Sequence, residues 1–494
     1  MENAQAKKLR VVVAGGGTAG WMTAAALAKL LGHHVSITLV ESEDIGTVGV
    51  GEATIPTMRS FHHLMGIDEA EFLRETSGTF KLGIQFDNWG KKGDTYIHAF
   101  GDTGKECWAG QFQHFWLRGL KEGLNAPFGD YSPELQAARA GKFALTNKPR
   151  LSYAYHLDAS AYARYLRKMS EQHGARRIEG KIQHVMLEPN NGFIQALCLE
   201  SGEKVEGDLF IDCTGFRALL IGKTLHTGYE DWSNIFICDS AVAAQTELAG
   251  EISPYTRSIA YEFGWRWRIP LQHRMGNGLV YSSQYISDDE ATALFLRELG
   301  ETPINTPRII KFKPGRRLKN WSKNCVAMGL SSGFIEPLES TSIHLISSSI
   351  IRLMRMIPIS GINQHDIDEF NRQSLIDIND VRDFVALHYK ATERADSDFW
   401  RYCKNMEVPE SLSRRIEIYR DSARIFWSSE ELFTANSWNQ VMLGQGIMPK
   451  TYHPVADLMS SEELQRYLSG YRQTIQNFVQ SLPTHADFLK TYCA

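Results

Sequence analysis

The chain lacks the features that mark several specialised classes of protein. No apolar run in its 494 residues is long enough to span a bilayer, and the polar, basic segment 1–10 matches a secretory signal poorly. Positive charge is not in excess, since the formal net charge is −4, so we expect neither nucleic acid nor a membrane surface as a partner. These absences predict a cytoplasmic globular protein, either a monomer or a homodimer.

Cysteine and histidine show no pattern that would indicate a disulfide framework or a metal site. The seven cysteines are scattered without a CxxC pair, and the sixteen histidines contain no HExxH spacing. We therefore expect reduced thiols and no bound metal.

The N-terminal segment has a clear strand–helix–strand pattern. Residues 10–14 and 35–41 are rich in β-branched residues and predict strands, whereas the alanine- and leucine-rich segment 18–31 predicts a helix. Strand-like segments follow at 81–87 and 95–99, and residues 156–174 predict a helix with an aspartate cap. Beyond about residue 345 most segments look helical, so we place a change of subdomain near 345–360.

A GxGxxG motif connects the first predicted strand to the helix. Gly15 allows a tight turn, Gly17 allows a pyrophosphate to approach the backbone, and Gly20 allows close packing of helix and strand. Glu41 follows Gly20 by 21 residues, where a carboxylate binds a ribose hydroxyl. The motif in this context predicts a dinucleotide site; a glycine-rich turn without a ligand is the alternative.

The segment 207–216, GDLFIDCTGF, helps to choose between FAD and NAD. A strand that ends in Asp-Cys-Thr-Gly, long after the first βαβ unit, is typical of FAD-dependent oxygenases. No second GxGxxG for a nicotinamide is present. We therefore predict FAD, reduced outside this chain.

Two further segments could carry chemistry. Lys81 opens the alternating segment KLGIQFDNWG; a lysine that points inward can act as a tuned amine, although most lysines lie on the surface. Trp265, Trp267 and Ile269 alternate before Pro270, and this periodicity alone predicts a half-buried strand with both indoles on one face.

The segment 333–346, GFIEPLESTSIHLI, places two carboxylates in apolar surroundings. Glu336 precedes a proline, so we place it in a turn, satisfied by local backbone amides, and assign it no chemistry. Glu339 is followed by Ser340, Thr341 and Ser342, which either cap a helix or form an anion-binding nest at its N-terminus.

Together these segments resemble the flavin-dependent halogenases of the tryptophan or indole type. The resemblance covers most of the chain, and the WxWxIP pattern separates this family from the flavin hydroxylases. The segments that carry it are GGGTAGW (15–21), VGVGEATIPT (48–57), KLGIQF (81–86), WRWRIP (265–270), GFIEPLEST (333–341) and NSWNQVMLGQGIMP (436–449).

The resemblance implies an α/β fold with two parts. A Rossmann-like FAD-binding module of the flavin monooxygenase (GR2) type covers 5–345, with a helix and loop insertion at about 101–150. A mainly helical substrate-side subdomain covers 346–494. Rival interpretations are a flavin-dependent aromatic hydroxylase and a non-enzymatic binding or chaperone module.

The resemblance also implies a reaction. FADH2 from a separate flavin reductase, O2 and a halide ion yield hypohalous acid, which crosses a tunnel to an indole-type substrate. Lys81 holds this acid or becomes a haloamine, and Glu339 assists and takes the proton of the substituted ring. A Lys81–Glu339 pair would also make the burial of the carboxylate tolerable.

The resemblance assigns the remaining roles by position. The third catalytic residue is Ser340, and the halide site is Thr341 with Ser342. The FAD contacts are Gly15, Gly17, Thr18, Ala19, Gly20, Glu41, Ala53, Ile182, Leu330 and Ile343. The tunnel residues are Trp265, Trp267, Ile269 and Pro270, and the substrate residues are Phe433 and Trp438.

Two positions depart from the family pattern. Ser342 stands where the family usually has glycine, and we hypothesise an altered halide preference, towards bromide. The stretch around Phe433 and Trp438 lacks the Tyr-Tyr pair of enzymes that act on free tryptophan. We therefore expect indole, a substituted indole or a larger indole-containing molecule as the substrate.

Overall fold

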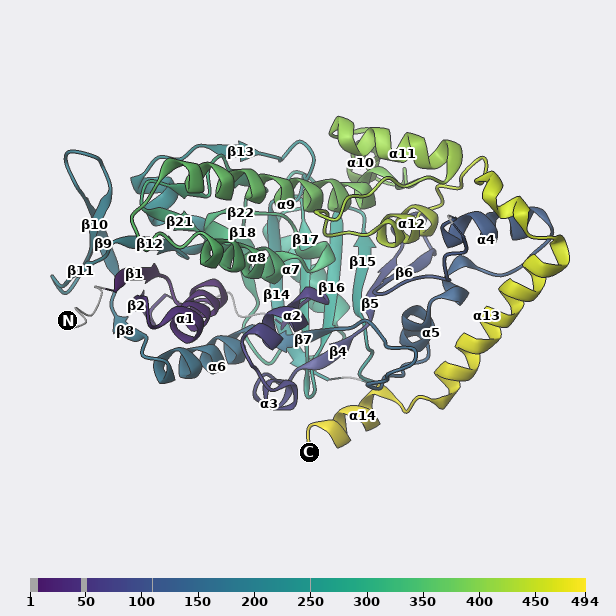
Figure 1. Ribbon diagram of the computed structural model, residues 1–494, viewed down its shortest axis with the longest axis horizontal. Coiled ribbons are helices and arrows are strands. Elements are labelled where there is room, and N and C mark those ends of the chain that lie inside the picture. The colour runs from purple at the N-terminus through teal and green to yellow at the C-terminus, as the bar shows by residue number, and fades with distance from the viewer. Residues whose placement is uncertain (1–7, 46–50, 109, 249) are drawn as a thin grey trace, which may run out of the picture.

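The computed structural model describes residues 8–45, 51–108, 110–248 and 250–494. The first three residues of the VGVGEATIPT segment, 48–50, therefore lie outside the described residues. A six-stranded and a seven-stranded sheet form the centre of the molecule, and helices cover them (Figure 1). The predicted α/β fold class is confirmed.

The six-stranded sheet contains the N-terminal βαβ unit. Its strands, in spatial order, are β20 (Trp321–Ser322), β21 (Cys325–Ala327), β12 (Leu209–Asp212), β1 (Leu9–Ala14), β2 (Val35–Glu41) and β8 (Arg176–Glu179). Strand β1 pairs in parallel with β2 on one side and with β12 on the other. Helix α1 (Thr18–Leu31) crosses between β1 and β2, as the alanine- and leucine-rich pattern predicts.

The seven-stranded sheet carries the WxWxIP segment near its middle. In spatial order its strands are β18 (Arg308–Lys311), β14 (Ser240–Glu247), β17 (Arg274–Tyr281), β16 (Gly264–Pro270), β15 (Thr256–Tyr261), β5 (Gly83–Asp87) and β6 (Thr95–Ala99). A small sheet of β3 (Gly51–Ala53), β7 (Ala154–Asp158) and β4 (Thr79–Lys81) lies beside it. Strand β3 contacts β16 and β17 of the larger sheet, so the two sheets adjoin.

Two further three-stranded sheets and several helices complete the N-terminal two thirds. The sheets are β11 (Lys204–Glu206), β10 (Ile194–Leu199) and β9 (Ile182–Leu187), and β13 (Tyr229–Asp231), β19 (Gly315–Arg317) and β22 (Gly333–Phe334). The helices are α2 (Thr57–Leu64), α3 (Glu69–Glu75), α4 (Phe112–Lys121), α5 (Pro133–Arg139), α6 (Ala159–Gln172) and α7 (Asp288–Leu299). Asp158 caps α6 by accepting hydrogen bonds from the amides of Ser160 and Ala161, which confirms the predicted aspartate cap.

Helices dominate the chain after β22, and the described part of this region contains no further strand. They are α8 (Ser342–Arg355), α9 (Gln364–Lys390), α10 (Asp398–Asn405), α11 (Glu410–Ser422), α12 (Ala435–Gly444), α13 (Ser461–Ser481) and α14 (His485–Tyr492). Helix α13 runs along the end of the molecule opposite α1 in Figure 1, and α14 brings the C-terminus back towards the lower middle. Within the described ranges, no helix is both long enough and apolar enough to cross a membrane.

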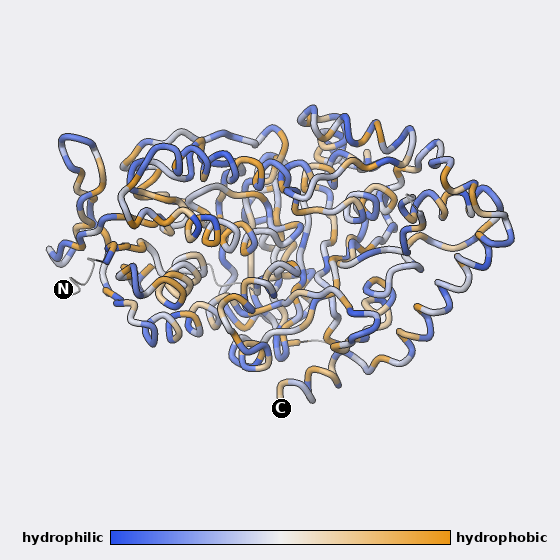
Figure 2. Tube along the Cα trace, in the orientation of Figure 1, coloured by the Kyte–Doolittle hydropathy of each residue, from blue (hydrophilic) through white to orange (hydrophobic). Residues whose placement is uncertain are grey.

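The C-terminal helices share a hydrophobic core with the seven-stranded sheet. Phe384 of α9 and Trp400 of α10 belong to the same buried cluster as Phe86 of β5 and Trp265 of β16. Figure 2 shows hydrophobic residues along the central strands and hydrophilic residues along much of α9 and the outer loops. The late helices therefore complete the interior around the sheet, which brings residues far apart in sequence together.

Candidate active site

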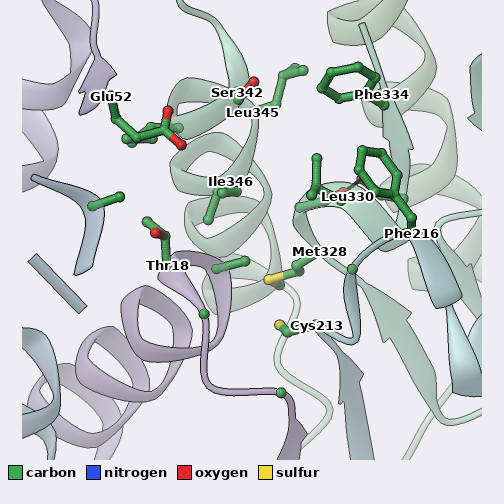
Figure 3. A pocket seen from close by; sticks show the side chains of 18 of the residues that line it. Thr18, Glu52, Cys213, Phe216, Met328, Leu330, Phe334, Ser342, Leu345 and Ile346 are labelled. Carbon is green, nitrogen blue, oxygen red and sulfur yellow. Dashed lines mark hydrogen bonds between the residues drawn. The ribbon is translucent and has the colours of Figure 1, made fainter. Parts of the chain in front are cut away.

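A cavity of about 720 Å³ extends from the glycine-rich turn to the start of α8. The turn after β1 and the segment after β12 contribute to the same wall because parallel strands end at the same edge of a sheet. Side chains of Thr18, Leu330 and Ser342 converge on this space in Figure 3. The cavity is therefore long enough to join the GxGxxG motif to the hydroxyl-rich segment.

The glycines of the turn fit a bound dinucleotide. Gly15 has a φ of 108°, and a Cβ there would lie 2.3 Å from the carbonyl oxygen of Cys213. Gly17 has open space where a side chain would be, so its backbone is accessible from the cavity. Gly20 faces the turn itself, since a Cβ would lie 1.9 Å from the Gly15 carbonyl oxygen. Gly20 is thus a packing residue and does not line the cavity, which corrects its assignment as a direct FAD contact.

Glu41 ends β2 on the cavity wall beside the glycine turn. A Cβ at Gly16 would collide with its carboxylate at 1.5 Å, which shows how closely the two segments approach. Arg177 donates a hydrogen bond of 2.6 Å to this carboxylate, and the indole nitrogen of Trp21 lies 3.3 Å from it. The carboxylate is therefore held in place at the position that sequence spacing predicts.

The other predicted FAD contacts also lie on the cavity wall. These residues are Thr18, Ala19, Ala53, Ile182, Leu330 and Ile343. The sequence did not indicate several further wall residues, namely Glu52, Phe216, Met328, Phe334, Leu345 and Ile346 (Figure 3). Burial raises the pKa of Glu52 to about 7. The apolar members have no motif that distinguishes them from ordinary core residues.

Lys81 is a buried residue at the end of β4, immediately behind the cavity wall. Its Nζ donates hydrogen bonds to Ser340 Oγ at 2.8 Å and to the carbonyl oxygen of Thr54 at 3.0 Å. Burial lowers the pKa of Lys81 to about 7, against the opposing attraction of Glu339. Since Ser340 lines the cavity, one hydroxyl group connects the lysine to this space.

The hydroxyl run after Glu339 does not cap helix α8 with its side chains. Thr341 occupies the N-cap position without a side-chain hydrogen bond to the helix, and Ser340 uses its hydroxyl to bind Lys81. Ser342 begins α8 and lines the cavity (Figure 3), and Thr341 lines it as well. The capping interpretation is thus wrong, and the N-terminal amides of a 14-residue helix remain available to an anion.

Glu339 is fully buried, but Lys81 does not pair with it. Its carboxylate is hydrogen-bonded to Nδ1 of His98 at 2.9 Å, and its other oxygen lies 2.8 Å from Nε2 of His388. Burial would raise the pKa of Glu339, but the two imidazoles outweigh that effect and lower it to about 2. The predicted Lys81–Glu339 pair is therefore corrected to a His98–Glu339–His388 cluster.

Glu336 is also fully buried, and no local backbone amide satisfies it. Its Oε2 accepts hydrogen bonds from the indole nitrogen of Trp265 at 2.8 Å and from the hydroxyl of Tyr389 at 2.5 Å. Burial raises the pKa of Glu336 to about 7 despite these two donors. The expectation of backbone partners is wrong because the turn presents the carboxylate to the sheet and α9 instead.

The WxWxIP segment forms β16, and both of its indoles lie on one face of the strand, as the alternation predicts. Trp265, Trp267 and Ile269 line the cavity; their role as tunnel residues stays a prediction. Pro270 does not line it: its carbonyl oxygen accepts a hydrogen bond of 2.8 Å from Thr79. Pro270 therefore ends the strand behind the wall, a correction to its assignment.

Phe433 and Trp438 lie beyond the cavity wall in an aromatic cluster near Glu339. Phe433 stacks on Phe384 with a centroid distance of 3.7 Å, and Trp438 meets the edge of Phe384 at 4.9 Å. His98, a partner of Glu339, contacts Phe433 at 6.3 Å. Aromatic side chains thus surround the buried carboxylate on the side away from the cavity.

The arrangement separates two environments. A large cavity with a dinucleotide-type turn lies on one side, and a buried amine and carboxylate with aromatic neighbours lie on the other. In the part of the chain that the structure describes, no group of three or more metal-ligating side chains is placed to hold a metal ion. Acid–base and amine chemistry are the reactions that the protein's own groups can support here.

Solved structures with the same fold define the class of this protein as a flavin-dependent halogenase. Xcc4156, a flavin-dependent halogenase from Xanthomonas campestris, superposes with a TM-score of 0.97 at 54% sequence identity, over 99% of each chain. BrvH, a flavin-dependent halogenase from Brevundimonas sp. BAL3, superposes with a TM-score of 0.94 at 43% identity, over 99% of this chain and all of that one.

The chain belongs to the tryptophan halogenase family, whose model matches residues 10–461. Tryptophan 6-halogenase ThaL from Streptomyces albogriseolus is 35% identical, over 97% of this chain and 98% of its own length. This membership confirms the resemblance drawn from the sequence motifs. It favours a halogenase over the hydroxylase and binding-module alternatives.

Proposed function

We propose that this enzyme halogenates an indole-type aromatic small molecule through hypohalous acid that Lys81 and Glu339 guide to the ring. The observation that carries this proposal is the position of Ser340. Its side chain lines the cavity and accepts a hydrogen bond from Lys81, while the adjacent Glu339 lies in the aromatic cluster. A reactive oxygen–halogen species made in the cavity would therefore reach Lys81 at the Ser340 hydroxyl.

FAD fits the cavity, and the glycine turn, Glu41 and the wall residues named above would hold it. Bound as FADH2, supplied by a separate flavin reductase, the cofactor contributes the O2-dependent oxidation of the halide. The accessible backbone at Gly17 and the uncapped N-terminus of α1 suit a pyrophosphate. The indoles of Trp265 and Trp267 stand in the wall and keep the organic substrate away from this compartment.

The halide would bind where α8 begins. Thr341 and Ser342 present backbone amides at the positive end of this helix, and their side chains make no cap that would occupy those amides. Ser342 adds a hydroxyl group that a glycine at this position would lack. We infer that this extra donor changes the size and hydrogen bonding of the halide site.

Lys81 and Glu339 have complementary charge properties for the transfer. With a pKa of about 7, Lys81 exists as ammonium, which can hold hypohalous acid by a hydrogen bond, and as amine. The free amine can attack the halogen, so that an N–X bond forms, the X–O bond breaks, and the amine proton leaves with hydroxide as water. The aromatic carbon then takes the halogen as the N–X bond breaks, the nitrogen takes up a proton from solvent to restore the amine, and the ring proton passes to a base.

Glu339 is the base that we assign to this last step. With a pKa of about 2 it remains a carboxylate across the working pH range. It can therefore take the proton from the cationic ring that forms when the halogen adds, because that proton is strongly acidic. The stacked Phe433 and the nearby Trp438 provide aromatic surface beside it. A flat, neutral indole suits this surface better than a zwitterionic amino acid, which would need charged partners.

Mass spectrometry of indole incubated with FAD, a flavin reductase system, O2 and bromide tests the proposal. We expect brominated indole from the wild type and at least a hundredfold loss in Lys81→Ala, because the amine is removed. Lys91→Ala, which changes an exposed lysine paired with Glu393, is the matched control. Oxygenated product alone would overturn the halogenase assignment, and tight binding of tryptophan without binding of indole would overturn the substrate class.

Ser342→Gly tests the halide hypothesis. We expect the wild type to turn over bromide faster than chloride and the variant to shift this ratio towards chloride, with FAD affinity unchanged. Competition of the two halides in one reaction, followed by mass spectrometry, measures the ratio directly. Equal turnover of both halides that Ser342→Gly leaves unchanged would contradict the hypothesis.

A further inference from the structure

We propose that Tyr96 and Gln445 are positioning residues that fix the ring proton of His388 on Nε2, the nitrogen that faces Glu339. This inference rests on the proposed function, in which Glu339 takes the proton of the substituted ring, and it adds the donors that stand behind this base. Tyr96 lies on β6, and Gln445 lies at the C-terminal end of α12. Both side chains are buried, and neither lines the large cavity.

A backbone carbonyl fixes the direction of the first hydrogen bond. The side-chain nitrogen of Gln445 donates to the carbonyl oxygen of His388 at 2.8 Å, an atom that can only accept. The same nitrogen lies 3.3 Å from the hydroxyl oxygen of Tyr96. Because an amide nitrogen can only donate, Gln445 gives its second proton to the Tyr96 oxygen. Turning the amide round would place two oxygens against each other, so this orientation is the one that the contacts allow.

Tyr96 therefore gives its own proton to His388. Its hydroxyl oxygen lies 2.8 Å from Nδ1 of the imidazole, and burial raises the pKa of Tyr96, so the phenol keeps its proton. Among the described residues, Gln445 and His388 are the hydrogen-bond partners of this hydroxyl group. If Nδ1 donated instead, the phenol proton would have no acceptor in a buried site, which is costly. Nδ1 of His388 is thus an acceptor.

The proton of His388 then lies on the other ring nitrogen. Burial lowers the pKa of His388, against the attraction of Glu339, so the ring is neutral and carries one proton. That proton is on Nε2, which lies 2.8 Å from Oε1 of Glu339. A carboxylate oxygen would repel a bare nitrogen lone pair at this distance, so the contact requires the same tautomer. Two separate arguments therefore direct the proton of His388 towards the carboxylate.

Phe86 of β5 holds the two rings of this chain. Its ring stacks on Tyr96 at 4.8 Å and on His388 at 4.5 Å, measured between centroids. The rings of Tyr96 and His388 are themselves within 11° of parallel. The lone pair of Nδ1 lies in the plane of the imidazole, so parallel rings joined by a short hydrogen bond suit this acceptor.

Helix α12 also holds the strand that carries Tyr96. The side chain of Gln440 accepts from the amide of Ala99 at 3.0 Å and donates to its carbonyl oxygen at 3.1 Å. Tyr96 and His98 alternate along β6, so they share one face of this strand. The helix therefore fixes both residues of β6 that approach the carboxylate, His98 by direct contact and Tyr96 through the imidazole.

The chain keeps His388 neutral beside a negative charge. The titratable groups that face His388 are Glu339, His98 and Tyr96. Glu339 favours an imidazolium, whereas the bond from Tyr96 is lost when Nδ1 takes up a proton and so favours the neutral ring. An imidazolium would neutralise Glu339 and weaken it as a base. Tyr96 and Gln445 thus preserve the basicity of the carboxylate from behind the histidine.

Nitrogen NMR of protein labelled with 15N-histidine tests the proton position without turnover. The signals of His388 are assigned as those lost in His388→Gln. At pH 7.5 we expect Nε2 to have the chemical shift of a protonated nitrogen and Nδ1 that of an unprotonated one. A proton on Nδ1, or on both nitrogens, would overturn this inference and leave the proposed function intact if indole is still halogenated.

Tyr96→Phe tests the consequence for titration and for the reaction. Losing one hydrogen bond of about 1 kcal/mol should raise the pKa of His388 by about 0.7 unit in an NMR titration. The ratio of kcat/KM at pH 6 to kcat/KM at pH 8 should fall by up to about fivefold relative to the wild type. Gln445→Met, which retains the phenol but removes its donor, should shift both quantities in the same direction by less.

Tyr162→Phe is the matched control. Tyr162 is also buried and also bonds a buried histidine, His62 at 3.0 Å, but it lies on α6. This variant should change neither the titration of His388 nor the activity ratio. A His388 titration that Tyr96→Phe leaves unchanged would overturn the chain, and a shifted titration with an unchanged ratio would overturn its role in the reaction. A wild type with the expected tautomer that halogenates no indole would overturn the proposed function instead.

Discussion

Glu336 and Glu339 lie three residues apart and are equally buried, but their pKa values are shifted in opposite directions. Neutral donors, an indole and a phenol, surround Glu336, and burial raises its pKa to about 7. Two imidazoles surround Glu339 and lower its pKa to about 2 against the effect of burial. The comparison shows that burial alone does not decide the protonation of a carboxylate; the chemical type of its partners does.

Helix α9 supplies a partner to each carboxylate from consecutive positions. His388 lies against Glu339, and Tyr389 donates to Glu336. One helix of the C-terminal region therefore holds one acid ionised and the other close to neutral. We infer that Glu339 is available for proton transfer, whereas Glu336 fixes the position of the Trp265 indole in the cavity wall.

The largest expected effect comes from Glu339→Gln. We expect kcat/KM for indole halogenation to fall at least a hundredfold, because the amide cannot accept the ring proton. Titration of FAD by absorbance should show unchanged affinity. Glu336→Gln is the matched control and should stay within a few-fold of the wild type. Equal losses in the two variants would contradict the division of roles.

His388→Gln should have a smaller effect that depends on pH. The His388 imidazole lowers the pKa of Glu339, so its removal raises that pKa. Glu339 is then protonated at a higher pH, and the base is lost earlier on acidification. We expect the acidic limb of the profile of kcat/KM against pH to move to higher pH, with activity at pH 7.5 reduced up to about tenfold. An unshifted profile in His388→Gln, identical to that of the exposed His173→Gln, would show that His388 only fills space.

The pH dependence of the free energy of unfolding should distinguish Glu336 from Glu339, with a smaller effect than the losses of activity. Because the pKa of Glu336 is raised in the folded protein, its contribution to the free energy of unfolding is complete below about pH 4.5. That contribution is lost as the pH rises through about 7. Glu336→Gln should therefore gain stability over the wild type between pH 5 and pH 8, by roughly 1–3 kcal/mol. Urea unfolding at several pH values measures this difference.

Glu339→Gln should show no such trend over the same range. Because the pKa of Glu339 is lowered in the folded protein, its contribution to the free energy of unfolding is present above about pH 4.5. That contribution is lost only as the pH falls through about 2. This variant should be less stable than the wild type by a constant amount from pH 5 to pH 8. A slope like that of Glu336→Gln would mean that the two environments have been assigned the wrong way round.

Tyr389→Phe should have the smallest effect. It removes one of the two donors to Glu336 and is expected to cost about 1 kcal/mol of unfolding free energy. Halogenation of indole should be almost unchanged, since Glu339 keeps both of its histidines. A shift of the urea midpoint without a change in kcat/KM supports this, whereas a large loss of activity would place Glu336 in the chemistry.

Much of the fold and of the cofactor site could be predicted because the signals are local. The strands β1 and β2, helix α1 and the turn between them follow from residue types within about thirty positions, and Glu41 follows from its spacing to Gly20. The one error in this region, Gly20 as a direct contact, concerns which side of a turn faces the cavity. A glycine pattern does not contain that information.

The carboxylate partners could not be predicted in the same way. His98 precedes Glu339 by 241 positions, and Tyr389 follows Glu336 by 53. No sequence pattern marks either residue, and the Lys81–Glu339 pair looked plausible because both groups were expected at the same site. In the folded protein Lys81 binds Ser340 and Thr54 instead, and the histidines take its expected place.

The sequence by itself determined the βαβ unit, the dinucleotide-type turn, the alternating indoles and the family, because each depends on residue type at short spacing. Only the tertiary structure decided which of two neighbouring carboxylates is ionised and which side chains are the partners of each. Those properties depend on the dielectric surroundings and on donors from distant strands and helices. Such partners meet only when α9 packs against the seven-stranded sheet.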